Sequence, residues 1–286
     1  MRYIKLSFDC KPITTYITCV TSIQDLSQRN KYYHVLVNYA RIVGLYQKYG
    51  KEKKLYLFLT HNGMLKKNSK YNVSGVTSDD LKNLYKRQML NNKEPRKIYD
   101  KLMSLAKLGK CPFCGLGQVS TLDHYLPKSE FPTFSVLPYN LIPCCKDCNH
   151  GKSIAYAVKE EEQTLHPYYD NYNDEQWLFA DVIESPSLSI RYKVLPPEYL
   201  TDIEKRRLKK HFDEYSLDKR FSIEASSELA TLTHRFNISS FDAKQIQEHL
   251  ISSEIAYMEQ YVNSWQRALY QALGKSEWYC NGGYKI

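Results

Sequence analysis

The chain has 286 residues, of which 43% are hydrophobic and 25% are charged. This length and composition allow a buried core and one or two domains, and they exclude an intrinsically disordered chain. No run approaches the ~18 consecutive apolar residues of a membrane-spanning helix, and the first residues lack the apolar segment of a secretory signal. We therefore expect a soluble, cytoplasmic protein that does not associate with membranes.

The net charge of +9 is unevenly distributed along the chain. Residues 1–110 contain 22 Lys or Arg and 7 Asp or Glu, a balance of +15, whereas residues 111–197 contain 6 and 11, a balance of −5. A region this basic attracts phosphate backbones, although it would also attract an acidic protein. We favour nucleic acid as the partner, because polar residue types suited to hydrolysis follow this region.

The basic region 1–110 is predicted to be mainly helical. Its first residues are the exception, because two β-rich runs at 2–8 and 13–20, separated by a turn, predict a short hairpin. Apolar residues at intervals of three and four, together with helix-starting residues, then predict helices over 23–49, 78–90 and 94–108. Residues 55–63 are too short and too apolar to assign, and residues 68–78 predict a loop.

The remainder of the chain divides at Pro196-Pro197. Residues 111–196 are expected to form a central domain that ends in a β-hairpin, with strands at 177–183 and 189–194. Residues 197–286 are expected to form a helical region. Its predicted helices span 198–215, 222–236 and one long amphipathic stretch over 241–274.

Two Cys-x-x-Cys pairs frame the stretch 111–152, which holds five of the eight cysteines. This spacing places two sulfurs in one tight turn, and four thiolates are a common ligand set for structural zinc. The four predicted ligands are Cys111, Cys114, Cys145 and Cys148. The structural alternative is a set of buried thiols without a metal, and Cys144 could replace Cys145 across one helical turn.

Between the two pairs, residues 119–127 predict a strand that carries Asp123 and His124. A carboxylate is a hard ligand suited to Mg²⁺, and a neutral imidazole can accept a proton from water near pH 7. Adjacent residues on a regular strand point to opposite faces, so both can serve one site only at a bulge or a strand end. The second cysteine pair is predicted to open a helix that turns Asn149 about 100° away from the face of the cysteines.

These residues resemble the HNH endonuclease family, in a zinc-stapled subgroup with Cys-x-x-Cys pairs. The resemblance covers residues 111–170 and is carried by Asp123-His124, by Asn140 in PYNLIP, and by Cys148-Asn149-His150-Gly151-Lys152. The position of Asn149 is often His in the family, so His150 is a second candidate for this role. The resemblance implies an α+β fold, mostly α-helical, with a central ββα-metal core stapled by a four-cysteine zinc site.

The resemblance also implies the roles of the site residues. His124 would be the general base, Asp123 and Asn149 would bind Mg²⁺ or Mn²⁺, and Asn140 would hold the loop of His124 by hydrogen bonds. Lys128 and Lys152 would contact phosphate, unless they are merely solvated. His166 and Asp170 resemble a segment that packs against the family's core, an interpretation we prefer to a second metal site.

The implied function is hydrolysis of phosphodiester bonds in DNA, as the nuclease effector of a bacterial defence system. The implied partners are DNA and an ATPase protein. The amphipathic stretch over 241–274 could also dock a partner or a second copy. The alternative is a zinc-stabilised nucleic-acid-binding or adaptor protein without catalysis. In that case, Asp123, His124 and Asn149 would have no reason to occur together.

Overall fold

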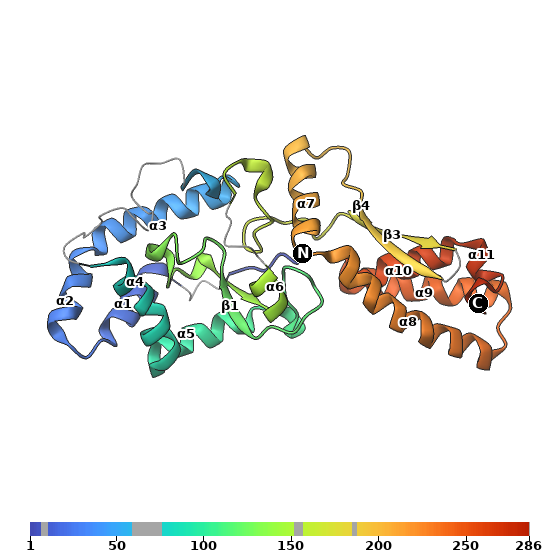
Figure 1. The fold of residues 1–286 in the computed structure, drawn as a ribbon, viewed down its shortest axis with the longest axis horizontal. Coiled ribbons are helices and arrows are strands. Elements are labelled where there is room, and N and C mark those ends of the chain that lie inside the picture. The colour runs from blue at the N-terminus through green and yellow to red at the C-terminus, as the bar shows by residue number, and fades with distance from the viewer. Residues whose placement is uncertain (7–10, 59–75, 152–156, 185–187, 286) are drawn as a thin grey trace. The chain divides into compact units, whose positions relative to one another are not determined.

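The computed structural model describes residues 1–6, 11–58, 76–151, 157–184 and 188–285, which form two compact units. The first unit is Met1–Asn171 and the second is Tyr172–Ile286 (Figure 1). The first unit joins the basic region 1–110 to the cysteine stretch, and the second joins the hairpin to the C-terminal helices. The division therefore falls at neither of the predicted boundaries, 110 and 196.

The predicted hairpin at the start of the chain is wrong, because residues 13–20 lie in the helix α1 (Pro12–Thr21). Pro12 occupies the first turn of α1, where its missing N–H costs nothing. The buried residues Thr15, Tyr16, Cys19 and Val20 recur at helical intervals, and the Tyr16 ring stacks on Tyr39 at 4.2 Å. Packing of this face overrides the β-propensity of the sequence.

The predicted helices of the basic region are confirmed with altered bounds. The stretch 23–49 is divided at Val35, and the stretch 78–90 continues from an α-helix into a π-helical turn. Thr77 and Asp80 form a capping box at the start of the second stretch. The elements are α2 (Leu26–His34), α3 (Leu36–Lys51), η1 (Leu55–Phe58), α4 (Ser78–Asn83), η2 (Leu84–Met89) and α5 (Lys93–Ser104). Most of the predicted loop 68–78 lies outside the described residues.

A small antiparallel sheet and a short helix form the centre of the first unit. The elements are β1 (Thr121–His124), β2 (Leu141–Cys144) and α6 (Lys146–Gly151). Thr121 is opposite Cys144 and His124 is opposite Leu141. Helix α5 packs against both strands, and α6 packs against β1. The strand predicted over 119–127 is confirmed over the shorter range Thr121–His124, and the helix predicted at the second cysteine pair is confirmed as α6.

An aromatic cluster packs α3 against the segment that connects β1 to β2. Tyr46 is fully buried, with its ring centroid 4.8 Å from that of Phe134 and 5.9 Å from that of Phe58. Phe134 belongs to a short 3₁₀ turn, η4 (Pro132–Phe134), and a second such turn, η5 (Pro138–Asn140), leads directly into β2. This cluster therefore joins α3 and η1 to the segment that connects β1 to β2.

The second unit consists of a hairpin covered by helices. Its strands β3 (Leu178–Ile183) and β4 (Ser189–Val194) pair antiparallel, which confirms the predicted hairpin. The helices are α7 (Asp202–Glu214), α8 (Leu217–Ser239), α9 (Ala243–Gln260), α10 (Trp265–Lys275) and α11 (Glu277–Cys280). Helix α10 packs on β3 and α8 packs on β4. No helix among these or the other described elements has both the length and the apolar character needed to cross a membrane.

The single long helix predicted over 241–274 is wrong, because the chain breaks into α9 and α10, which pack on each other. Tyr261 is extended, and Ser264 caps α10 by accepting from the Arg267 N–H. The Asn263 side chain accepts from Trp177 N at 2.8 Å and donates to Glu175 O at 2.7 Å. These long-range bonds hold the break in place, and periodicity alone cannot reveal them.

Candidate metal centre and adjoining pocket

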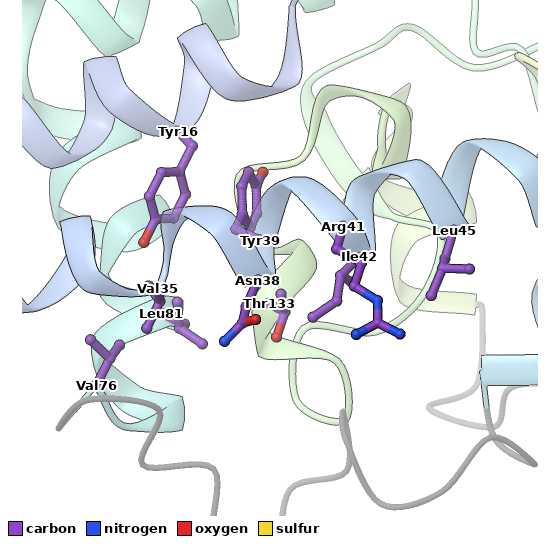
Figure 2. Close-up of a pocket in the computed structure, with 10 residues that line it drawn as sticks. All are labelled: Tyr16, Val35, Asn38, Tyr39, Arg41, Ile42, Leu45, Val76, Leu81 and Thr133. Atoms are coloured by element: carbon purple, nitrogen blue, oxygen red, sulfur yellow. The ribbon is translucent and has the colours of Figure 1, made fainter.

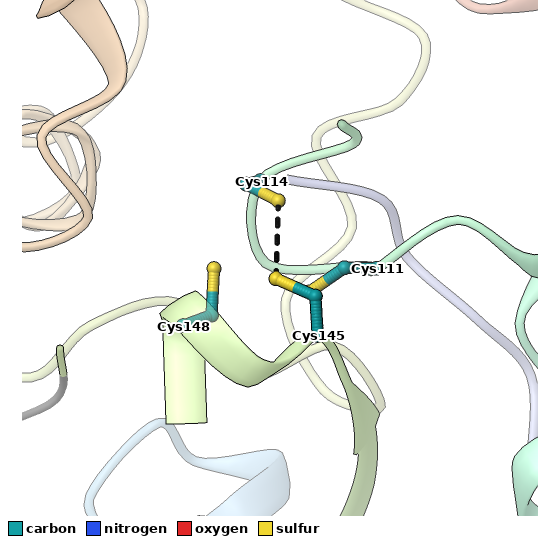
Figure 3. Close-up of side chains that lie close together, drawn as sticks. All are labelled: Cys111, Cys114, Cys145 and Cys148. Atoms are coloured by element: carbon teal, nitrogen blue, oxygen red, sulfur yellow. Dashed lines mark hydrogen bonds between the residues drawn. The ribbon is translucent and has the colours of Figure 1, made fainter. Parts of the chain in front are cut away.

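Four buried cysteines converge in the first unit. The Sγ atoms of Cys111, Cys114, Cys145 and Cys148 all lie within 4.8 Å of one another, and Figure 3 shows the two pairs facing each other. Four thiolates at this separation match the tetrahedral ligand set of structural zinc. The predicted four-cysteine group is therefore confirmed, and it could hold a structural metal such as zinc.

Cys111 and Cys114 lie in a tight turn whose backbone N–H groups point at the Cys114 sulfur. Gly115 has φ +70°, a conformation that favours glycine. The turn directs the N–H groups of Leu116 and Gly117 to the Cys114 Sγ, each at 3.4 Å. Such donors stabilise a thiolate, and hydrogen bonding with the Cys111 thiol lowers the pKa of Cys114 to about 6. The turn thus prepares Cys114 as a metal ligand.

The positions of the sulfur atoms distinguish Cys145 from Cys144 as the fourth member of the group. Cys145 is the last residue before α6, Cys148 lies one turn further, and the Asn149 N–H donates to Cys145 O at 3.1 Å. Cys144 is the last residue of β2 and is fully buried, but its Sγ donates to Cys145 O at 3.2 Å and does not belong to the group. The preference for Cys145 is confirmed, with Cys144 as its packed neighbour.

A pocket of about 400 Å³ brings several predicted site residues together. Asp123, His124, Lys128 and Asn149 all line it. His124 is the last residue of β1. Asp123 and His124 therefore lie at a strand end, where two adjacent side chains can line the same pocket. His150, the second candidate for the role of Asn149, is exposed on α6 and does not line the pocket. Lys152 lies outside the described residues.

One nitrogen of the His124 ring is held by the backbone. Nε2 lies 2.9 Å from the carbonyl oxygen of Ser135. A carbonyl can only accept, so Nε2 carries the proton and the lone pair of the neutral ring is on Nδ1. The ring also meets the edge of Tyr85, with centroids 4.6 Å apart. The neutral His124 ring is thereby oriented with Nδ1 as its accepting atom.

Asn140 is fully buried and does not line the pocket. Its Oδ1 accepts from Leu126 N at 2.7 Å, and its Nδ2 donates to Leu126 O at 3.0 Å and to Phe134 O at 3.3 Å. The Asn140 side chain therefore joins the loop that follows His124 to the segment that carries Ser135. Its contacts support the positioning role that was predicted for it.

The His166 segment packs against this loop. The Tyr168 N–H donates to His166 Nδ1 at 3.2 Å, so Nε2 carries the proton and donates to the Tyr46 hydroxyl at 3.4 Å. Asp170 accepts from the His166 N–H at 2.7 Å. In the described part of the chain, the cysteine cluster is the only group of three or more cysteine, histidine or carboxylate side chains that could hold a metal. The contacts of His166 and Asp170 therefore agree with the packing role.

Comparison with known proteins identifies a phage relative. No known family model and no solved structure matches the chain. The chain is 32% identical over 226 residues to protein ea31 of Escherichia phage lambda, which covers 73% of this chain and 76% of ea31. The chain belongs to the ea31 family. The name of the relative states no activity, so the function of this ea31-family protein must be argued from its own residues.

Two tyrosines at the site of this ea31-family protein do not belong to any motif in the sequence. Tyr46, from α3, donates its hydroxyl to Asn140 Oδ1 at 2.9 Å, and burial raises its pKa well above 10. Tyr85, from η2, lines the pocket, and the Lys128 Nζ lies 5.4 Å from the centroid of its ring. Neither tyrosine belongs to a motif, and only tertiary contacts place each of them at the site.

A second pocket, of about 200 Å³, lies beside α1 and α3 (Figure 2). Its lining is mainly apolar, with Tyr16 and Tyr39 on one side and the polar groups of Asn38 and Arg41 nearby. None of the predicted site residues lines it. The predicted site residues that line a pocket are therefore found at the end of β1.

We expect Tyr46→Phe to destabilise the first unit by about 1–3 kcal/mol, because His166 Nε2 and Asn140 Oδ1 each lose a buried partner. Urea unfolding followed by circular dichroism measures the change. Tyr33→Phe is the matched control, because Tyr33 is 39% exposed, and its expected effect is within about 0.5 kcal/mol. Equal midpoints for the two variants would contradict the role given to Tyr46.

Proposed function

We propose that this protein is a metal-dependent endonuclease of the HNH type that hydrolyses phosphodiester bonds in DNA. The observation that carries the proposal is the meeting of Asp123, His124 and Asn149 at one pocket, on a strand and a helix beside the four-cysteine group. A carboxylate, an imidazole and a side-chain amide in one pocket provide a hard ligand set and a base. These are the groups that metal-assisted phosphodiester hydrolysis needs.

The donor set fits a hard divalent cation. Asp123 offers a carboxylate oxygen and Asn149 an amide oxygen, the ligand types of Mg²⁺ and Mn²⁺, while the soft sulfurs nearby suit zinc. When bound, such a cation stabilises the negative charge that develops on the phosphate and on the leaving oxygen. Zinc on the four cysteines would have a structural role, because four protein ligands leave no open position.

In the proposed reaction, His124 Nδ1 takes a proton from the attacking water. The Ser135 carbonyl keeps the proton of the neutral ring on Nε2, so the accepting lone pair is on Nδ1. Asn140 holds the segments on both sides of this bond, through Leu126 and Phe134. The lining residue Lys128 supplies a positive charge near the substrate phosphate.

Incubation of the purified protein with supercoiled plasmid and Mg²⁺ or Mn²⁺ tests the proposal. We expect conversion to nicked or linear DNA that depends on the added cation and stops when the cation is withheld. Plasmid that is bound but left intact, with and without candidate partners, would support the alternative of a non-catalytic nucleic-acid-binding protein. The basic balance of residues 1–110 favours binding in either case.

A bacterial defence setting and an ATPase partner remain proposals that rest on the resemblance to HNH proteins, whereas self-association through the C-terminal helices is a proposal that rests on the amphipathic pattern of residues 241–274. The relative from a phage adds no support to the defence setting. Cleavage assays with and without a candidate ATPase address the partner, and light scattering addresses self-association.

A further inference from the structure

The pocket beside α1 and α3 combines an apolar wall with polar groups (Figure 2). Its aliphatic lining comes from Val35, Ile42, Leu45, Val76 and Leu81. An apolar cavity of about 150 Å³ can hold one benzene molecule. At about 200 Å³, this pocket therefore has room for a single small ring or a short alkyl chain.

Three polar side chains of the lining are not used by the fold. Within the described residues, the side chains of Asn38, Arg41 and Thr133 form neither a hydrogen bond nor an ion pair. Asn38 and Arg41 lie about one helical turn apart on α3, and both are exposed, so a ligand can reach them from solvent. All three side chains carry N–H or O–H donors, and the guanidinium is always charged.

The charges on the helices around this pocket favour an anion. Helix α3 carries three cations and no carboxylate, and α1 carries no charged residue. The carboxylates at the start of α4 are engaged locally, because Asp79 pairs with Lys82 and Asp80 accepts from the Thr77 N–H in the capping box. Arg41 is therefore the lining residue that attracts a negative charge on a ligand.

We propose that this pocket binds a small molecule with a carboxylate and a compact apolar body. The apolar body would lie against Ile42 and Leu81. The carboxylate would be bound by Arg41, with Asn38 as a second donor. This pocket shares no lining residue with the pocket at the end of β1. Binding here is therefore independent of the proposed nuclease activity.

Titration of phenylacetate into protein labelled at its Ile, Leu and Val methyl groups, followed by NMR, tests this site. We expect saturable shifts of the Ile42 and Leu81 methyl signals, because both side chains line the pocket. Phenylacetamide is the matched ligand, because it keeps the ring and lacks the charge. It should bind about three- to tenfold more weakly than phenylacetate, the effect of one lost charged contact at a partly exposed site.

Arg41→Gln should weaken phenylacetate binding by the same factor and leave phenylacetamide binding nearly unchanged, because only the carboxylate interacts with the guanidinium charge. Lys48→Gln is the matched control, because it removes the same charge from an exposed position of α3 that does not line the pocket. It should bind phenylacetate as the wild type does.

Three results would overturn the site. The first is the absence of saturable shifts at the lining methyl groups of the wild type, with or without shifts elsewhere in the chain. The second is equal affinity of the wild type for phenylacetate and phenylacetamide. The third is an equal loss of both ligands in Arg41→Gln, which would show that the guanidinium does not recognise the carboxylate.

Discussion

Replacement of His124 by Ala is expected to lower the rate of plasmid cleavage by about 10²–10⁴-fold, the usual contribution of a general base. The loss follows from the geometry, because Nδ1 is the lone-pair nitrogen of a ring held at Nε2 by Ser135 O. Gel quantification of nicked and linear plasmid against time, at fixed Mg²⁺, gives the rate. The zinc content and melting temperature of the variant show whether its fold is intact.

His150→Ala is the matched control for this experiment, because His150 is exposed on α6 and lies outside the pocket. It should cleave at the rate of the wild type. If His124→Ala fails to fold, Asn149→Ala provides a second test. Loss of this oxygen ligand should weaken Mg²⁺ binding, so cleavage should require a higher Mg²⁺ concentration. A His150→Ala rate as low as that of His124→Ala would contradict the assignment of the site.

Replacement of Cys145 by Ser is expected to abolish metal binding at the cysteine group and to unfold much of the first unit. Structural zinc contributes about 10–16 kcal/mol of apparent binding free energy in small zinc-dependent folds, and this energy is coupled to folding. The metal would hold the turn that carries Cys111 to the start of α6, two segments that are distant in the chain. Atomic emission spectroscopy of purified protein and circular dichroism measure both effects.

Cys144→Ser is the matched control, because Cys144 is next in the chain and equally buried but lies outside the group. It should keep the metal, at a cost of about 1 kcal/mol for the altered hydrogen bond to Cys145 O. Loss of the metal from Cys144→Ser, with retention in Cys145→Ser, would reverse the ligand assignment. Wild-type protein purified without any metal, and insensitive to chelators, would exclude a metal at this group.

Local sequence patterns are sufficient to predict much of the candidate site. The Cys-x-x-Cys spacing places two sulfurs in one turn, and it predicted all four cysteines, including Cys145 in place of Cys144. The strand that carries Asp123 and the helix that starts after Cys145 were also predicted, because each depends on neighbours in the chain. The same holds for the hairpin of β3 and β4, whose two strands are only a few residues apart.

Tertiary structure alone decided the features that depend on distant residues. The β-prone residues 13–20 became helix α1 because Tyr16 packs on Tyr39, and the helix over 241–274 broke because Asn263 bonds to Glu175 and Trp177. Tyr46 and Tyr85 joined the site from helices without a motif. In each case the deciding energy comes from burial or from a hydrogen bond across the fold, and spacing along the chain does not record such contacts.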